Sequence, residues 1–155
     1  MAFSPNQKDV RLEQLMPLFR QRLSQGQSVR FGPKGTSMQP MLRQGLDTVE
    51  LSPLPERLKK YDLPLYQRKD GSFILHRIIR VSDTYTCMGD NQFDPEPGLE
   101  HSQMIGLVTA FYREDRRISV NAWYYKLYCR LWHYSRPIRK PWRRFKLFLR
   151  SKLKK

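Results

Sequence analysis

Residues 63–81 read LPLYQRKDGSFILHRIIRV and predict a β-hairpin. Asp70-Gly71 is a strong tight-turn signal, and it separates two runs rich in apolar residues, 63–68 and 73–81. Neither face of the second strand is purely polar, so we expect that strand to be buried on both sides. Its side chains should alternate between the two faces, with Ile74, His76 and Ile78 on one and Leu75, Arg77 and Ile79 on the other.

Short elements continue on both sides of this hairpin. Strands are predicted at residues 28–31, 48–51, 85–88 and 105–112, in the pattern of a small coiled β-sheet body. Helical spacing of apolar residues predicts helices at 9–24, 122–134 and 142–153, and Pro17 should kink the first of these or end it early. The expected fold class is mainly β, with an N-terminal helical segment (1–27), a body (28–116) and a basic, aromatic helical tail (117–155).

Charge separates the tail from the body. The 155 residues carry a formal net charge of +15; residues 1–112 hold 14 Lys and Arg against 12 Asp and Glu, whereas residues 113–155 hold 15 against 2. The first residues lack the pattern of a secretory signal, and no run reaches the roughly 18 apolar residues of a spanning helix. Two cysteines do not make a disulfide framework, so we expect a reducing compartment.

Three blocks of sequence carry the chemistry. In chain order they are Lys34-Gly35-Thr36-Ser37-Met38-Gln39-Pro40-Met41-Leu42, Ile74-Leu75-His76-Arg77-Ile78-Ile79 and Gly89-Asp90-Asn91. Together with flanking blocks they extend over residues 34–108, and the chain resembles the signal peptidase I and SOS-repressor superfamily of serine peptidases. Each block alone is compatible with an ordinary turn or core strand. Their occurrence in the family's order favours the resemblance.

The resemblance implies a fold and a set of roles. The body would be a signal-peptidase-like domain in which Ser37 is the nucleophile and His76 its base, at a position where bacterial leader peptidases usually have Lys. The Ser37 backbone N–H, helped by Thr36, would stabilise the oxyanion. Asp90 is the first candidate for the carboxylate that orients His76, with Asp94 and Glu96 as alternatives, while a simple Ser/His dyad remains open. Arg77 matches the basic residue that follows the catalytic one.

The chain departs from the family pattern in several places. It has no transmembrane helix before the nucleophile and no helix-turn-helix ahead of the body. Gly35 stands where many leader peptidases have a serine that helps to bind the oxyanion. Tyr61 stands where the family commonly has glycine. None of these differences removes Ser37 or His76.

The predicted reaction is hydrolysis of a peptide bond by a Ser/His mechanism. A serine hydroxyl needs a neighbouring base, and a histidine of ordinary pKa would give an acidic limb of activity at about pH 6–7, lower if the ring is buried. The substrate is a peptide or protein: a leader, a precursor or the chain itself. Oligomeric state and cleavage preference are left open.

Competing sites are weaker. Cys87 lies in an apolar strand pattern typical of a core thiol, and His101 and His133 lack other ligands at metal spacing. No metal or other cofactor is predicted, because no ligand cluster and no glycine-rich phosphate loop is present. The main alternative to an enzyme is a non-catalytic adaptor that keeps the peptidase fold and binds a membrane surface or nucleic acid.

The sequence of the tail indicates where in the cell the protein is located. In residues 142–153 one helical face carries Trp142, Phe145, Leu149 and Leu153, and much of the remainder is basic. Such a helix typically lies at an anionic membrane surface. Packing within the molecule, a solvated face and nucleic-acid binding are the alternatives. We expect a cytoplasmic protein that is peripheral at the inner face of the membrane.

Overall fold

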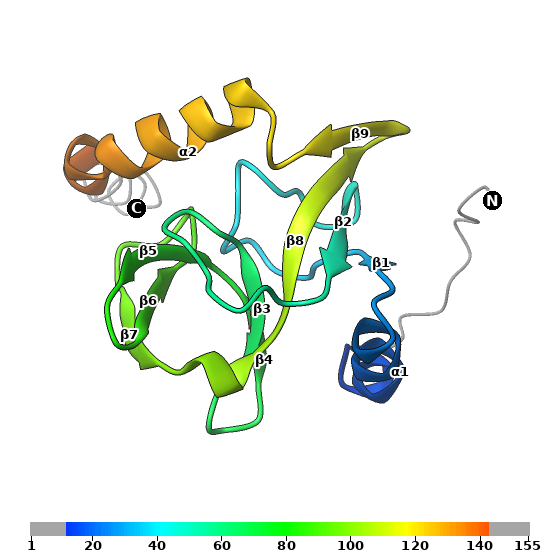
Figure 1. The fold of residues 1–155 in the computed structure, drawn as a ribbon. Helices are drawn as coiled ribbons and strands as arrows, with labels where there is room; N and C mark the ends of the chain where they lie inside the picture. Colours follow the sequence, from blue (N-terminus) through cyan, green and yellow to red (C-terminus); the bar gives the residue numbers. More distant parts are fainter. Residues whose placement is uncertain (1–11, 143–155) are drawn as a thin grey trace, which may run out of the picture.

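Two antiparallel β-sheets form the body of the protein in a computed structural model that describes residues 12–142 (Figure 1). Helices stand at both ends of the described chain. The elements are α1 (Leu12–Ser24), β1 (Val29–Phe31), β2 (Asp47–Ser52), β3 (Pro64–Gln67), β4 (Phe73–Leu75), β5 (Arg77–Val81), β6 (Tyr85–Met88), β7 (Glu96–Leu99), a 3-10 turn (His101–Gln103), β8 (Met104–Arg113), β9 (Arg116–Ser119) and α2 (Trp123–Tyr134).

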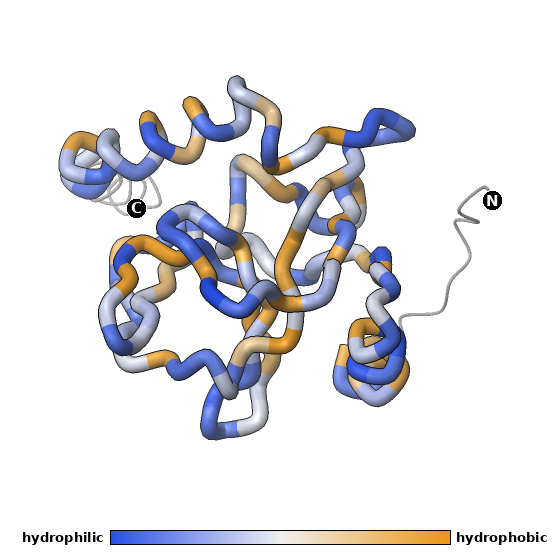
Figure 2. Tube along the Cα trace, in the orientation of Figure 1, coloured by the Kyte–Doolittle hydropathy of each residue, from blue (hydrophilic) through white to orange (hydrophobic). Residues whose placement is uncertain are grey.

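The ten-residue strand β8 organises the larger sheet. The order of the strands is β1-β2-β8-β3-β4, and β9 also pairs with β8. The first half of β8 pairs with β3 and the second half with β9, while β2 runs along the other edge. Hydrophobic residues follow β8 through the middle of the molecule (Figure 2). The smaller sheet has the order β5-β6-β7.

The predicted hairpin is present and joins the two sheets. Leu65 pairs with Leu75 and Gln67 with Phe73 across the Asp70-Gly71 turn. The second strand differs from the prediction because it is interrupted at His76, where the chain leaves the larger sheet as β4 and enters the smaller one as β5. The expectation of burial on both sides is confirmed for residues 75–78, which are all buried, whereas Arg80 and Val81 at the end of the strand are exposed.

Two apolar clusters follow the alternation of this strand. Leu75 belongs to the larger cluster, which also contains the buried residues of α1 and the inner face of the larger sheet. Ile78 belongs to the smaller cluster, between the two sheets, with Tyr66, Tyr85 and Cys87. Burial of alternate side chains on opposite sides therefore fixes which way His76 and Arg77 point, since they lie between these anchors.

Helix α1 packs on the larger sheet through Met16, Phe19 and Leu23, which recur at helical spacing. The Phe19 ring lies 5.4 Å from that of Phe31 in β1, measured between centroids. Pro17 lies inside the helix, which continues to Ser24; of the two predicted outcomes, a kink or an early end, the early end is therefore wrong. Within residues 12–142, no helix has the length and apolar character needed to cross a membrane.

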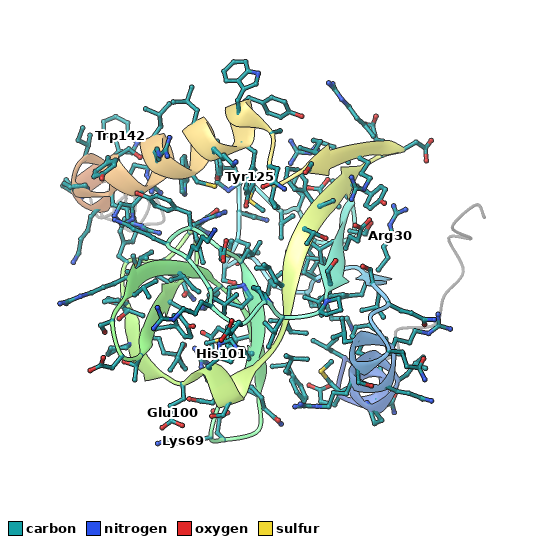
Figure 3. The ribbon with its side chains drawn as sticks, viewed as in Figure 1. Arg30, Lys69, Glu100, His101, Tyr125 and Trp142 are labelled. Atoms are coloured by element: carbon teal, nitrogen blue, oxygen red, sulfur yellow. The ribbon has the colours of Figure 1, made fainter. Side chains whose placement is uncertain are left out.

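Most of β9 and all of α2 lie beyond residue 116, where the predicted body ends. β9, at Arg116–Ser119, pairs with the end of β8 and extends the larger sheet beyond residue 116. Helix α2 then packs against the body through Tyr125 and Cys129, and Figure 3 shows Tyr125 directed from the helix towards the sheets. The first tail helix is thus an integral part of the fold. Most of the predicted helix at 142–153 lies outside the described residues.

Candidate active site

Ser37 sits in a tight turn that is anchored on both sides. Gly35 has φ +89°, a left-handed conformation that a serine side chain would adopt only with strain, and its N–H donates to Gln44 Oε1 at 2.9 Å. After Ser37, the side chains of Met38, Met41 and Leu42 are buried in the larger cluster. The turn therefore holds Ser37 half-buried at its surface.

Both groups of Ser37 that the proposed chemistry needs are unengaged. Among the described residues, neither its hydroxyl nor its backbone N–H has a hydrogen-bond partner. The hydroxyl is therefore available to a base, and the N–H to an oxygen that develops negative charge.

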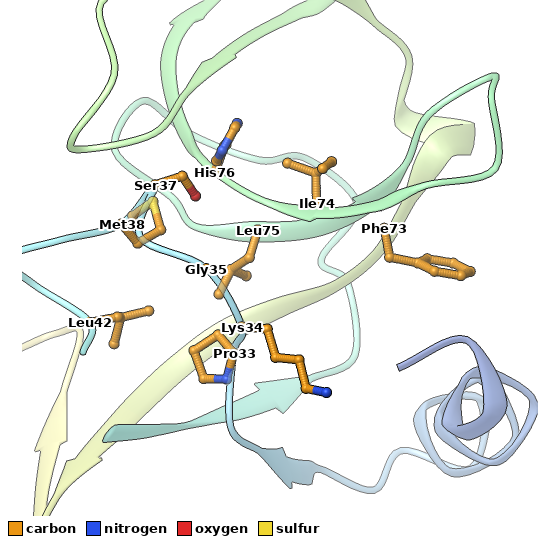
Figure 4. Close-up of a pocket in the computed structure, with 10 residues that line it drawn as sticks. All are labelled: Pro33, Lys34, Gly35, Ser37, Met38, Leu42, Phe73, Ile74, Leu75 and His76. Carbon is orange, nitrogen blue, oxygen red and sulfur yellow. The ribbon is translucent and has the colours of Figure 1, made fainter. Parts of the chain in front are cut away.

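His76 lines the same pocket as Ser37, although the two residues come from separate segments. The pocket is formed by the 33–42 segment on one side and β4 with His76 on the other. Figure 4 shows the labelled Ser37 and His76 side chains at the same end of this pocket. The structure thus brings together the two residues that the sequence predicted to act as a pair.

The partner of the His76 ring is Tyr66, and not a carboxylate. Tyr66 Oη lies 3.4 Å from His76 Nδ1 and donates its own proton to Glu96 Oε2 at 2.7 Å. Arg68 holds Glu96 through two further hydrogen bonds, each of 2.7 Å. A phenol has one proton, so towards His76 its oxygen can only accept. The contact is long, but it favours the tautomer with the proton on Nδ1 and a lone pair on Nε2, as a base requires.

Burial keeps His76 neutral. The side chain is 4% exposed, and removal from water is the largest cause that lowers the pKa of His76 from 6.5 to about 4. The positive charge of Arg68 also lowers the pKa, whereas the carboxylates of Glu96 and Asp90 raise it. The Arg68 hydrogen bond lowers the pKa of Glu96, so this carboxylate is ionised behind Tyr66 at neutral pH.

Asp90 is placed differently from the sequence prediction. Both of its carboxylate oxygens accept hydrogen bonds from Arg77, at 2.8 Å from Nε and 2.8 Å from Nη2. Arg77 follows His76 on the strand and points to the opposite side, and this ion pair is buried. Asp90 therefore forms its ion pair with Arg77. The sequence had made it the first candidate for the carboxylate that orients His76. Asp94 is exposed, and within residues 12–142 its carboxylate has no partner.

Each residue of the Gly89-Asp90-Asn91 block makes a different contact near the pocket. Gly89 lies so close to Ser37 that a Cβ would come within 2.6 Å of the Ser37 carbonyl oxygen. Asn91 donates its backbone N–H to that oxygen at 2.8 Å and its side-chain amide to the Thr36 carbonyl at 3.1 Å. Through Asp90 and Arg77, the same block is tied to the strand that carries His76. It thus fixes the two halves of the pocket relative to each other.

Arg77 connects this arrangement to α2. Its Nη1 donates to Tyr125 Oη at 2.9 Å and to Cys129 Sγ at 3.0 Å. From the same helix, Trp132 Nε1 donates to the Asp90 carbonyl at 2.8 Å. Helix α2 therefore braces the ion pair from outside.

Tyr61 lies in a tight turn before β3. Its φ is +78°, in the left-handed region where glycine is preferred. The strained turn is kept because the Tyr61 N–H donates to the Ile78 carbonyl at 2.8 Å and its own carbonyl accepts from Arg77 at 3.1 Å. The ring also packs edge-on against His133. The turn serves to support Arg77.

The competing residues are occupied elsewhere. Burial raises the pKa of the Cys87 thiol to about 12, so the thiolate that a nucleophile requires is scarce. His101 Nδ1 lies 3.2 Å from Tyr85 Oη, and His133 Nδ1 lies 2.7 Å from an Arg136 nitrogen. The part of the chain that the structure describes contains no group of three or more His, Cys, Asp or Glu side chains that could hold a metal ion.

Comparison with known proteins adds no relative to this picture. No protein-family model matches the chain, and a search of curated proteins finds no significant match.

Proposed function

We propose that the protein is a serine endopeptidase in which Ser37 is the nucleophile and His76 the general base. The observation that carries this proposal is the shared pocket: a turn serine, whose hydroxyl has no hydrogen-bond partner within residues 12–142, and a neutral histidine line the same small cavity. The resemblance to signal-peptidase-like enzymes, which rests on the same residues, supports the same reading.

The reaction would proceed in two halves. In the first, His76 Nε2 takes the proton of the Ser37 hydroxyl while Oγ attacks the peptide carbonyl, and the Ser37 N–H stabilises the oxyanion. His76 then returns the proton to the leaving amine as the C–N bond breaks, which leaves an acyl-enzyme. In the second half, water gives a proton to His76 and attacks the ester, and the proton passes back to Ser37 as the acid product departs.

Tyr66 and Glu96 supply what a triad carboxylate would supply. Protonation of His76 at Nε2 creates a cation in a buried site, where it is disfavoured. Tyr66 Oη accepts a hydrogen bond from the Nδ1–H group of His76. It can act only as an acceptor there, because its own proton is donated to Glu96. Tyr66 is therefore a positioning residue in this proposal. Glu96 acts through it, so the alternative carboxylate considered from the sequence has an indirect role.

The proposed substrate is a peptide or protein segment, such as a leader, a precursor or the chain itself, and the proposed location is the cytoplasmic face of a membrane. Support for this location comes from the sequence of the tail, where residues 113–155 hold 15 Lys and Arg against 2 acidic residues. Attraction to anionic headgroups amounts to about 1 kcal/mol per basic residue close to the surface.

One observation favours the non-catalytic alternative. His76 is 4% exposed and partnered by Tyr66, as a structural core histidine would be. An adaptor that keeps the peptidase fold would have the same contacts, and hydrolysis is what separates the two readings.

The test is cleavage of a diverse peptide mixture, followed by mass spectrometry of the new termini. Wild-type protein should produce new termini, and Ser37→Ala and His76→Ala should lose activity by several orders of magnitude while remaining folded. His101→Ala is the matched control, because it also removes a histidine bonded to a tyrosine hydroxyl but lies away from the pocket. Undiminished cleavage by either pocket variant would reject the mechanism.

A further inference from the structure

The outer face of α2 presents a row of large apolar side chains to solvent. Four residues at helical spacing form it, and all are substantially exposed: Trp123 (75%), Leu127 (45%), Leu131 (61%) and Tyr134 (68%). Figure 2 shows hydrophobic positions on the outward turns of this helix. We call these four residues the outer row. Contiguous exposed apolar side chains of this kind mark interaction surfaces more often than isolated ones do.

The body does not use the outer row, because the opposite face of α2 is the packed one. Tyr125 and Cys129 are 6% and 2% exposed and contact Arg77. Trp132 holds the Asp90 carbonyl from the same side. These contacts fix the rotation of the helix about its axis and direct the outer row away from the sheets.

The apolar surface continues beyond α2. Residues 136–142 are helical, and Ile138 and Trp142, four residues apart, are 76% and 70% exposed. Figure 3 shows Trp142 at the outer end of this segment. Tryptophans thus stand at both ends of the exposed surface, and tryptophan is enriched where apolar and aqueous phases meet.

Positive charge borders the outer row, without compensation by acids. Lys126 and Arg130 are exposed, and a period of 3.6 residues places them immediately beside Trp123 and Tyr134 on the helix. Residues 116–155 contain no Asp or Glu, and seven of the thirteen residues after Trp142 are Lys or Arg. A partner for this surface must therefore accept apolar side chains and cations together.

Three kinds of partner can be compared on these terms. A second copy of the chain would place Lys126 and Arg130 against like charges, with no acid of α2 to offset them. Nucleic acid would satisfy the cations, but Leu127 and Leu131 can neither stack on bases nor bond to phosphates. An anionic bilayer surface accommodates both the apolar side chains and the cations, because the aliphatic side chains enter the acyl boundary while the cations remain among the headgroups.

We infer that the outer row of α2, continued by Ile138 and Trp142, is a docking surface for anionic phospholipid bilayers. This inference deepens the membrane part of the proposed function and does not depend on catalysis at Ser37. It moves the membrane contact from the tail helix predicted at 142–153 to a helix whose inner face braces Arg77 and Asp90. The catalytic body is then held rigidly at the membrane surface.

The test compares two double variants of the full chain that remove equally exposed leucines. Leu127→Gln with Leu131→Gln disrupts the outer row. Leu18→Gln with Leu46→Gln is the control, because these leucines are 47% and 65% exposed and lie outside α2. Both variants should retain the wild-type circular dichroism and melting temperature. Binding is measured by flotation with vesicles of phosphatidylcholine alone or mixed with phosphatidylglycerol.

We expect wild-type protein and the control variant to bind the anionic vesicles and to bind neutral ones far less. The affinity of the outer-row variant for anionic vesicles should be lower than that of wild type by a factor of about ten or more. Ser37→Ala should bind as wild type does, so a failure of docking and a failure of catalysis are read separately. Equal binding of anionic vesicles by both double variants would overturn the inference. So would a finding that wild type and the control variant are dimers while the outer-row variant is a monomer. Binding of wild type to nucleic acid and not to vesicles would overturn it as well.

Discussion

Acidification should destabilise the protein through His76, and the structure sets both the sign and the size of the effect. Burial lowers the pKa of His76 from 6.5 to about 4 in the folded chain, whereas the unfolded chain keeps the ordinary value. The unfolded state therefore binds a proton first as the pH falls. The contribution of neutral His76 to stability is fully present above about pH 6.5 and is lost progressively towards about pH 4. The difference between the two pKa values corresponds to about 3 kcal/mol in the free energy of unfolding.

Urea denaturation at a series of pH values, followed by circular dichroism, measures this loss. The informative quantity is the difference in unfolding free energy between wild type and His76→Gln, because other titrating groups contribute equally to both proteins. That difference should shrink by about 3 kcal/mol between about pH 7 and pH 4. His101→Gln, which removes an exposed histidine, should follow wild type throughout. A difference that stays constant with pH, or an NMR titration of His76 centred on 6.5, would refute the reasoning.

Four further predictions concern the pocket. The acidic limb of kcat/KM should lie near pH 4, below the value expected for an exposed histidine, because only neutral His76 accepts the serine proton; a limb above about pH 8 would exclude this base altogether. Tyr66→Phe removes the acceptor for Nδ1–H and should lower kcat about tenfold or more with little change in KM, and unchanged kinetics would remove its positioning role. Asp90→Asn leaves a buried guanidinium without its counter-ion, and should reduce the unfolding free energy by about 3–5 kcal/mol in a denaturation experiment; a loss of activity without a loss of stability would return Asp90 to the catalytic role. Gly89→Ala should displace the nucleophile turn and abolish activity, whereas Gly32→Ala, whose added Cβ meets nothing closer than 4.0 Å, should behave as wild type; if both variants remained active, the close packing of this turn would be unimportant.

Local sequence patterns predicted the elements that build the pocket. The Asp70-Gly71 turn and the alternation around His76 placed the hairpin correctly, because a tight turn and two apolar faces fix register together. The three sequence blocks also identified Ser37 and His76, which the fold brings to one pocket. The turn, the alternation of side chains and the three blocks are local patterns of neighbouring residues, so they can be recognised in the sequence.

Tyr66 was missed although the sequence contained a signal for it. With the hairpin closed at Asp70-Gly71, Tyr66 pairs with Ile74, and His76 lies two residues further along on the same face. Cross-strand geometry puts such diagonal neighbours within reach of an aromatic side chain. In this register Tyr66 is the diagonal cross-strand neighbour of His76, and this geometric relation is the signal that was missed.

Other features depend on contacts that no local pattern encodes. Asp90 was the first candidate for the partner of His76, but Arg77 points to the opposite side of the same strand and donates hydrogen bonds to both of its carboxylate oxygens. The short strands β7 and β9 were not predicted, because Glu96–Leu99 contains Pro and Gly, and Arg116–Ser119 is mostly polar. Both form by pairing with strands already in place. Likewise, the packing of Tyr125 and Cys129 of α2 on Arg77 decides which face of this helix remains exposed.

Covalent labelling with a fluorophosphonate probe, read by mass spectrometry of the digested protein, tests directly whether His76 activates Ser37 as a nucleophile. The probe phosphonylates a serine that a neighbouring base activates. We expect a single adduct on Ser37 that disappears in Ser37→Ala, falls by orders of magnitude in His76→Gln and is retained in His101→Gln. Absence of any adduct on folded wild-type protein, or labelling of Ser37 that is indifferent to His76, would contradict this activation.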